Sequence, residues 1–205
     1  MDTTKTKIKN RNIKNLMPNT NSSTIKVQKR DGRLEDLDIN KIHFVVEEAC
    51  EGLAGVSSSQ IEMNANIQFY DGMTTKDIQN VLVRSANDLI SLETPNYQYA
   101  AARLLSYDVR KEAHGQYEYI PLLKLILRNI RSGVYDKAIL DKYTKTEIKK
   151  FNTWIKRERD LKFTYAGLRQ ICDKYLVQDR SSGQIYETPQ DMYMMISATL
   201  FADYP

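Results

Sequence analysis

The sequence predicts a mainly helical α+β protein in which a small β-hairpin precedes four helices and a second helical region follows. Two observations support this fold class. Residues 25–39 form two short apolar–polar stretches around an Asp-Gly pair, which is typical of a hairpin. From residue 41 onward, apolar residues recur at spacings of three and four behind polar capping residues, which is typical of amphipathic helices.

The predicted hairpin has a first strand over residues 25–29 and a return strand over residues 33–39. The turn between them is expected at Asp31-Gly32, because both positions tolerate the positive φ that tight hairpin turns require. We therefore expect a two-stranded element at the start of the ordered chain.

Capping residues divide the next region into four helices, which completes a unit of about 90 residues. The signals are Asn40 for a helix over 41–54, Ser57 with Gln60 for a helix ending near 67, Thr74 with Asp77 for a long third helix, and Pro95 for a fourth ending near 113.

A second helical region is predicted after Gly115, with helices over 118–131, 144–157, 164–173 and 189–201 and a hairpin turning at 179–183. The last helix is rich in large apolar residues, and we expect a partner to cover them. These residues are Met194, Met195, Ile196, Leu200 and Phe201.

The formal net charge of +4 lies entirely in residues 1–24, which carry five lysines and arginines against one aspartate. We expect these residues to form a disordered basic tail. The neutral remainder argues against specific nucleic-acid binding. A run of about 18 apolar residues is absent and the N-terminus lacks the apolar core of a secretory signal. The sequence therefore predicts no membrane span and a cytoplasmic location.

Catalytic chemistry is sparse in this sequence. Cys50 and Cys172 stand far apart in no metal-ligand spacing, so buried inert thiols are favoured over a disulfide or a zinc site. A structural role is also favoured for His43 and His114. Neither a Walker loop nor a glycine-rich dinucleotide motif is present. We expect no catalytic and no metal-binding residue in the chain.

One corner of the predicted fold could receive an anion. Lys29 and Arg30 flank the hairpin turn, and Lys41 opens the next helix, whose free N–H groups attract negative charge. On the pattern alone, a solvated turn with ordinary surface lysines is the favoured interpretation.

Three stretches of sequence resemble the large subunit of class I (aerobic) ribonucleotide reductase. Two of them resemble its ATP-cone domain: VQKRDGRLEDLDINKIH, and IQFYDGMTTKDI with ETPNYQYAAARLLSYDVRKEAHGQ. The third, residues 135–205, resembles the helical segment that leads into the catalytic barrel. The resemblance covers residues 25–205 and implies an ATP-cone at 25–114 and a reductase helical segment at 115–205.

The resemblance also implies an allosteric site for ATP or dATP, with Mg²⁺ accompanying the nucleotide. Glu35 would meet the adenine, and Lys41 and Lys111 the phosphates. The residues it assigns are Lys29, Arg30, Glu35, Asp36, Leu37, Asp38, Ile39, Asn40, Lys41, Thr75 and Lys111.

Gln79 and Asp108 depart from the family pattern, because its best-studied members carry histidines there. Asp108 would repel phosphate, so we expect inhibition by dATP to be weakened. In the alternative interpretation, Asp108 points to solvent and Gln79 hydrogen-bonds as a histidine would.

The resemblance implies a regulatory part of an oxidoreductase that makes deoxyribonucleotides for DNA replication. The catalytic cysteines belong to a ten-stranded barrel beyond residue 205. We expect a separate C-terminal chain to supply this barrel, a small subunit to supply a diiron-tyrosyl radical, and the large subunit to dimerise. The alternative is a free-standing nucleotide-sensing regulator, although such a protein would not need residues 118–205.

Overall fold

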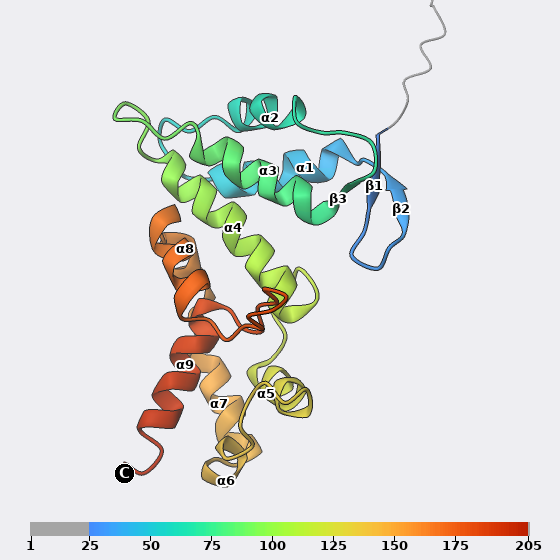
Figure 1. Ribbon diagram of the computed structural model, residues 1–205. Helices are drawn as coiled ribbons and strands as arrows, with labels where there is room; N and C mark the ends of the chain where they lie inside the picture. Colours follow the sequence, from blue (N-terminus) through green and yellow to red (C-terminus); the bar gives the residue numbers. More distant parts are fainter. Residues whose placement is uncertain (1–24, 205) are drawn as a thin grey trace, which may run out of the picture.

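A computed structural model describes residues 25–204, so the tail predicted at 1–24 lies outside the described residues. The fold is mainly helical with a small sheet, which confirms the predicted fold class (Figure 1). The elements are β1 (Lys26–Gln28), β2 (Leu34–Asp36), α1 (Ile39–Cys50), α2 (Ser58–Asn66), β3 (Met73–Thr74), α3 (Thr75–Asn87), α4 (Tyr97–His114), α5 (Leu122–Arg131), α6 (Ile139–Lys142), α7 (Lys145–Trp154), the 3₁₀ helix η2 (Arg157–Lys162), α8 (Tyr165–Lys174) and α9 (Pro189–Leu200).

The sheet has three strands in the order β2-β1-β3. β1 pairs antiparallel with β2, where Val27 lies opposite Glu35, and parallel with β3, where Val27 lies opposite Met73. The sequence did not predict β3, because a strand of two residues is too short to show an alternating pattern. Its pairing brings the start of α3 next to the hairpin.

The hairpin turn is wider than predicted. The Lys29 N–H donates to the Arg33 carbonyl at 2.8 Å, which leaves a three-residue loop. Gly32 has a φ of 84°, whereas Asp31 has a negative φ, since all positive-φ residues among residues 25–204 are glycines. This is the geometry of a three-residue hairpin loop with glycine in the left-handed position, so the predicted two-residue turn was wrong.

The first helix also begins earlier than predicted. Asp38, not Asn40, is the N-cap of α1: its carboxylate accepts from the backbone N–H groups of Asn40 and Lys41 at 3.1 and 3.4 Å. The helix ends at Cys50, because Gly52 turns the chain at a φ of 70°. The predicted caps Ser57, Thr74 and Thr144 are confirmed, and Thr144 forms a full capping box with Glu147.

In the second region, α5 begins at Leu122 and not at residue 118, because Pro121 restricts the residue before it and cannot lie inside a helix. α7 ends at Trp154, and η2 and α6 were not predicted. The predicted second hairpin forms a single β-bridge, between Gln178 and Ile185.

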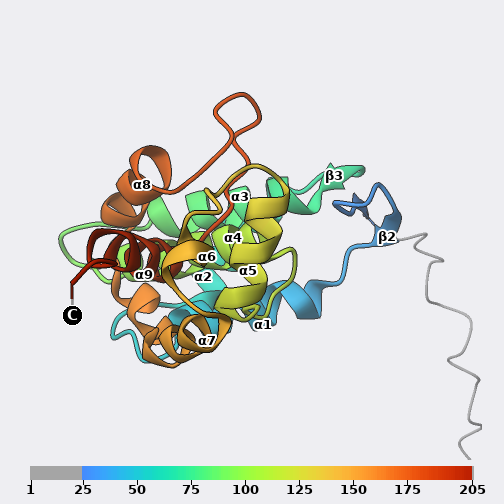
Figure 2. The same ribbon diagram turned by 90° about the horizontal axis from the view of Figure 1, so that it is seen from below.

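The long helix α4 joins the two halves of the molecule (Figure 1). One hydrophobic core surrounds it and includes side chains from α1, α2 and α3 together with Leu168, Cys172, Leu176 and Met192 from the C-terminal half. A second core lies among α5, α6, α7 and α9, which gather on the face seen in Figure 2. The hydrophobic packing around α4 therefore includes residues from both sides of the domain boundary that was predicted near residue 114.

None of the helices described between residues 25 and 204 is both long enough and apolar enough to cross a membrane.

Candidate nucleotide-binding site

A cleft of about 550 Å³ opens between the β1–β2 hairpin, α1, the start of α3 and the end of α4. Nine of the eleven residues predicted for the nucleotide line it: Lys29, Arg30, Glu35, Asp36, Leu37, Asp38, Lys41, Thr75 and Lys111.

Ile39 and Asn40 do not line the cleft. They occupy the first turn of α1, where both are exposed, and the Ile39 side chain is 62% exposed. Their place in the predicted set came from the continuity of a sequence motif, whereas the helix aims neither side chain at the cleft. Among these neighbours, Asp38 and Lys41 are the ones that reach it.

The cleft combines an apolar floor with a charged rim. Val27, Ile42, Ile78 and Leu82 are buried side chains of the core that also line the cleft. An apolar floor can receive a flat base, and a rim of lysines and arginines can receive phosphate oxygens. Thr75 is the first residue of α3, so it brings the helix N-terminus to the rim.

Most cations of the rim are paired with a neighbouring carboxylate. The amino group of Lys29 lies 3.2 Å from Glu35, that of Lys41 lies 3.4 Å from Asp38, and the guanidinium of Arg33 lies 2.8 Å from Asp31. These pairs are largely exposed and hold their side chains only weakly.

Lys111 differs from these cations, since it has no ion pair within 4.0 Å among the described residues. Its amino group lies 5.7 Å from the centre of the Tyr117 ring. Burial lowers the pKa of Lys111, and the neighbouring charge of Arg30 lowers the pKa further. An arriving anion would stabilise the charged form of Lys111.

The two positions that depart from the family pattern both take part in the fold. The Nε2 of Gln79 donates to the Leu104 carbonyl at 2.8 Å, so Gln79 links α3 to α4. Asp108 is only 7% exposed, and its Oδ1 accepts from Nη2 of Arg30 at 2.8 Å. The alternative in which Asp108 points to solvent is therefore wrong.

Two family models match the chain: the ATP cone domain over residues 25–112, and the all-alpha domain of ribonucleotide reductase over residues 161–204. The chain therefore carries the ATP cone and the all-alpha domain that are found in the amino-terminal region of ribonucleotide reductase alpha subunits. This confirms the resemblance seen in the sequence, while the domain limits near residue 114 stay a prediction.

Among the chain's relatives, ribonucleoside-diphosphate reductase 1 subunit alpha of Escherichia coli is 45% identical over 87% of the chain. The corresponding alpha subunits of Haemophilus influenzae and of Enterobacteria phage T4 are each 43% identical, over 90% and 88% of the chain. In all three cases the match spans 24% of the relative, so the chain covers about a quarter of their length.

The two cysteines of the chain have raised pKa values. Burial raises the pKa of Cys50 to about 11 and that of Cys172 to about 12. Both thiols therefore stay protonated near neutral pH, and neither is a ready nucleophile.

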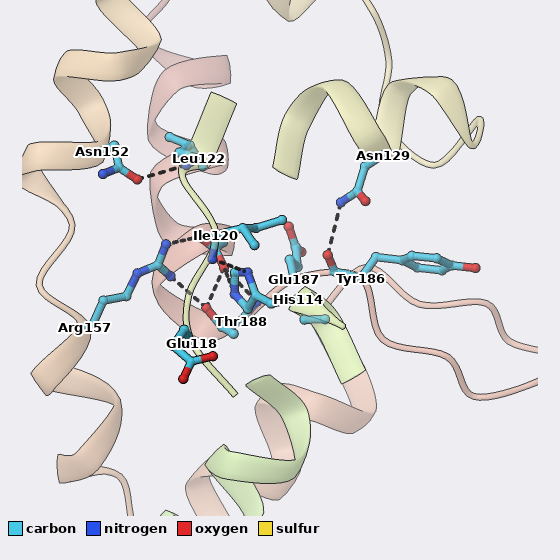
Figure 3. Close-up of polar contacts among 12 residues, drawn as sticks. His114, Glu118, Ile120, Leu122, Asn129, Asn152, Arg157, Tyr186, Glu187 and Thr188 are labelled. Atoms are coloured by element: carbon cyan, nitrogen blue, oxygen red, sulfur yellow. Dashed lines mark hydrogen bonds and ion pairs between the residues drawn. The ribbon is translucent and has the colours of Figure 1, made fainter. Parts of the chain in front are cut away.

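A second polar cluster lies at the C-terminal end of α4, around His114, and contacts the start of α9 (Figure 3). Asp191 is fully buried there; its Oδ1 accepts from Arg157 at 2.6 Å, and its Oδ2 accepts from the Thr188 hydroxyl at 2.6 Å. Nε2 of His114 lies 3.2 Å from the same Asp191 oxygen, and its Nδ1 accepts from the Ile120 N–H. His114 is therefore held by the hydrogen bond at Nδ1, while its Nε2 lies close to the Asp191 carboxylate without a hydrogen bond among the described residues.

Proposed function

We propose that this chain is the nucleotide-sensing amino-terminal part of a ribonucleotide reductase large subunit and binds ATP or dATP, with its Mg²⁺, in the cleft beside the hairpin. The observation that carries this proposal is the meeting of Lys29, Arg30, Lys41 and Lys111 above an apolar floor, within the residues that match the ATP cone. These cations come from three separate elements, and a triphosphate would bind all of them at once.

Substituting the two lysines tests this proposal. The double variant Lys29→Ala/Lys111→Ala is expected to weaken ATP binding about 100-fold or more, because each lysine contributes a charge-assisted contact to phosphate. Isothermal titration calorimetry with the 205-residue chain measures the change. Lys124→Ala, on the exposed surface of α5, is the matched control and should bind as the unchanged chain does. ATP affinity that survives the double substitution would place the site elsewhere.

The 205 residues span about a quarter of the length of the alpha subunits that they match. We propose that a C-terminal large-subunit chain supplies the catalytic barrel and its cysteines, that the large subunit dimerises, and that a small subunit supplies the diiron-tyrosyl radical. The all-alpha match at residues 161–204 favours this proposal over a free-standing nucleotide regulator, which would need the cone alone.

The surface around α9 fits such an assembly. A groove of about 540 Å³ runs between α6, α9 and the second hairpin, and most of its lining is apolar. Ile196, Leu200 and Phe201 lie exposed on or beside it. Covering each would stabilise the complex by roughly 1.5–3 kcal/mol.

We expect these 205 residues by themselves to bind a hydrophobic dye at this groove and to show no reductase activity, since they span only about a quarter of the length of the reductase alpha subunits that they match. Adding the C-terminal chain and the small subunit should displace the dye and start ribonucleotide reduction. Ile196→Ser/Leu200→Ser should weaken dye binding and assembly together, whereas Leu92→Ser, on an exposed loop of the cone, should change neither. Turnover by the isolated chain would refute the proposal that a C-terminal chain supplies the catalytic barrel.

The departures at Gln79 and Asp108 bear on regulation. Neither side chain can carry a positive charge, and both are engaged inside the fold. We propose that dATP inhibition of the assembled enzyme is weak for this reason. Strong inhibition in an activity titration with dATP would show that these two positions do not control the response.

A further inference from the structure

Arg30 is tied to the protein more firmly than the other cations on the rim of the cleft. Its partner Asp108 lies 78 positions away in the sequence, on α4, and the two side chains are 2.8 Å apart. The Asp108 side chain is 10% exposed, whereas the acids that pair with Lys29 and Lys41 are about 40% exposed. Solvent reaches both partners of the latter pairs, whereas in the Arg30–Asp108 pair it reaches mainly Arg30, which is 42% exposed, and screens that pair less.

Arg30 is the neighbour that most favours the charged form of Asp108. Burial raises the pKa of Asp108, and the charge of Arg30 is the strongest opposing influence. The other charges that face Asp108 are Glu112 and Lys111 on α4 and Lys76 on α3. Lys76 is itself paired with Glu112 at 3.3 Å, and Lys111 faces the cleft. Arg30 is thus the close counter-ion of Asp108.

The same guanidinium lines the proposed phosphate site. We propose that Asp108 is an internal competitor of the effector: it holds Arg30 as a phosphate would, and a triphosphate must draw Arg30 away from Asp108 in order to bind tightly. This inference rests on the proposed nucleotide function and adds a residue that sets the affinity of that site.

A guanidinium has five N–H donors, so Asp108 could instead orient Arg30 toward a phosphate that it contacts with its free nitrogens. Competition is favoured by the charges around the pair. A phosphate bound to Arg30 would lie close to a buried carboxylate, and two negative charges in a poorly solvated site repel strongly. Burial of Asp108 keeps water from screening this repulsion. The two roles predict opposite effects of neutralising Asp108.

The experiment measures ATP affinity by calorimetry for the full chain and for three variants, Asp108→Asn, Arg30→Ala and the double variant. Asp108→Asn keeps the side-chain shape and is expected to tighten ATP binding about tenfold, the size of one charge-assisted bond released for phosphate. In the Arg30→Ala background, Asp108→Asn should tighten ATP binding by no more than about threefold, because the guanidinium for which Asp108 and phosphate compete is absent. Asp108→Ala provides a second neutral variant, and thermal unfolding checks that each variant is folded.

Glu112→Gln is the matched control. It also removes a negative charge from α4, one turn beyond Asp108. Glu112 pairs with Lys76 and not with Arg30. Its Oε1 accepts from the Ile185 N–H at 2.9 Å, and the amide oxygen of glutamine can still accept this hydrogen bond. We expect its ATP affinity to stay within about twofold of the unchanged chain, since Arg30 keeps its partner.

A tenfold gain confined to the Asp108 variants and dependent on Arg30 would support the competition. If the chain without substitutions binds ATP and Asp108→Asn binds it equally well or more weakly, the competition between Asp108 and phosphate is overturned, and the proposed nucleotide function still stands. An equal gain in Glu112→Gln would assign the effect to overall charge and would also overturn it. If neither the unchanged chain nor Asp108→Asn binds ATP, the proposed function and this inference both fail.

Discussion

Replacing Asp191 with alanine is expected to lower the free energy of unfolding by roughly 3–5 kcal/mol, the range for removing one partner of a buried charge pair. Asp191 is 0% exposed and caps α9 through the Thr188 N–H and hydroxyl. It also faces Arg157 at 2.6 Å and His114 at 3.2 Å. Alanine would remove the acceptor of Arg157 and of the Thr188 N–H and hydroxyl, and would leave the His114 imidazole without its neighbouring carboxylate.

Urea unfolding followed by circular dichroism measures this loss, with Asp173→Ala as the control. Asp173 forms an exposed pair with Arg169 on α8, at 3.1 Å and a spacing of four residues, so its loss should cost less than about 0.5 kcal/mol. Asp191→Asn keeps the capping geometry without the charge and should fall between the two. Equal stabilities for Asp191→Ala and Asp173→Ala would show that the cluster does not hold α9.

The same carboxylate predicts sensitivity to acid. Burial alone would raise the pKa of Asp191, but its contacts with His114 and Arg157 lower the pKa well below the usual range. A carboxylate with a lowered folded-state pKa stabilises the fold above its unfolded pKa of about 4, and this contribution is lost as the pH falls toward the folded-state value. Unfolding titrations below pH 4 should therefore show a steep loss that Asp191→Asn does not share.

The parts of this fold that the sequence predicted are those that depend on neighbouring residues. An N-cap such as Thr144 needs only the N–H and the carboxylate of Glu147, three residues onward. The capping box could therefore be predicted without knowledge of the tertiary structure. Pro189 at the start of α9 has the same local cause. The N-cap of α1 was misplaced by two residues because Asp38 and Asn40 are both good caps, and only the geometry of the chain decides between them.

Features made by distant contacts were not predictable in this way. β3 exists because two residues pair with β1, some 45 positions earlier, and two residues carry no periodicity of their own. The pattern placed Lys29, Arg30 and Lys41 in one corner, since they are near in sequence. Lys111 was assigned to the site only from the family resemblance. It lines the cleft because the end of α4 lies next to the hairpin. The Arg30–Asp108 pair had no signal in the pattern at all.

Asp160 illustrates this limit, and replacing it with asparagine is expected to stabilise the chain by roughly 2–3 kcal/mol at pH 8 and by almost nothing near pH 4. Asp160 lies in η2, an element that the sequence did not predict, and is 0% exposed. Neither of its carboxylate oxygens has a hydrogen-bond partner among the described residues. Burial raises its pKa to about 7, although Gln190 and Arg157 oppose this shift.

The sign follows from proton counting. Between the unfolded pKa near 4 and the folded value of about 7, the folded chain binds the extra proton, so stability falls as the pH rises through this window and then levels off. Asparagine never ionises and removes this slope. Unfolding free energies at pH 5 and pH 8 measure the slope, and Asp141→Asn, exposed on α6, should keep it.

Arg110 is a further influence that opposes this prediction, and its Nε and Nη2 are also buried without hydrogen-bond partners among the described residues. Its guanidinium lies over the rings of Tyr117 and Tyr119, at 4.1 and 4.9 Å, and these contacts stabilise its charge independently of Asp160. If Arg110 relied on Asp160 for its charge, Asp160→Asn would destabilise the chain at pH 8. Because the tyrosines already hold the arginine, we expect the gain from removing a buried, unpartnered carboxylate to exceed the loss of its attraction to Arg110.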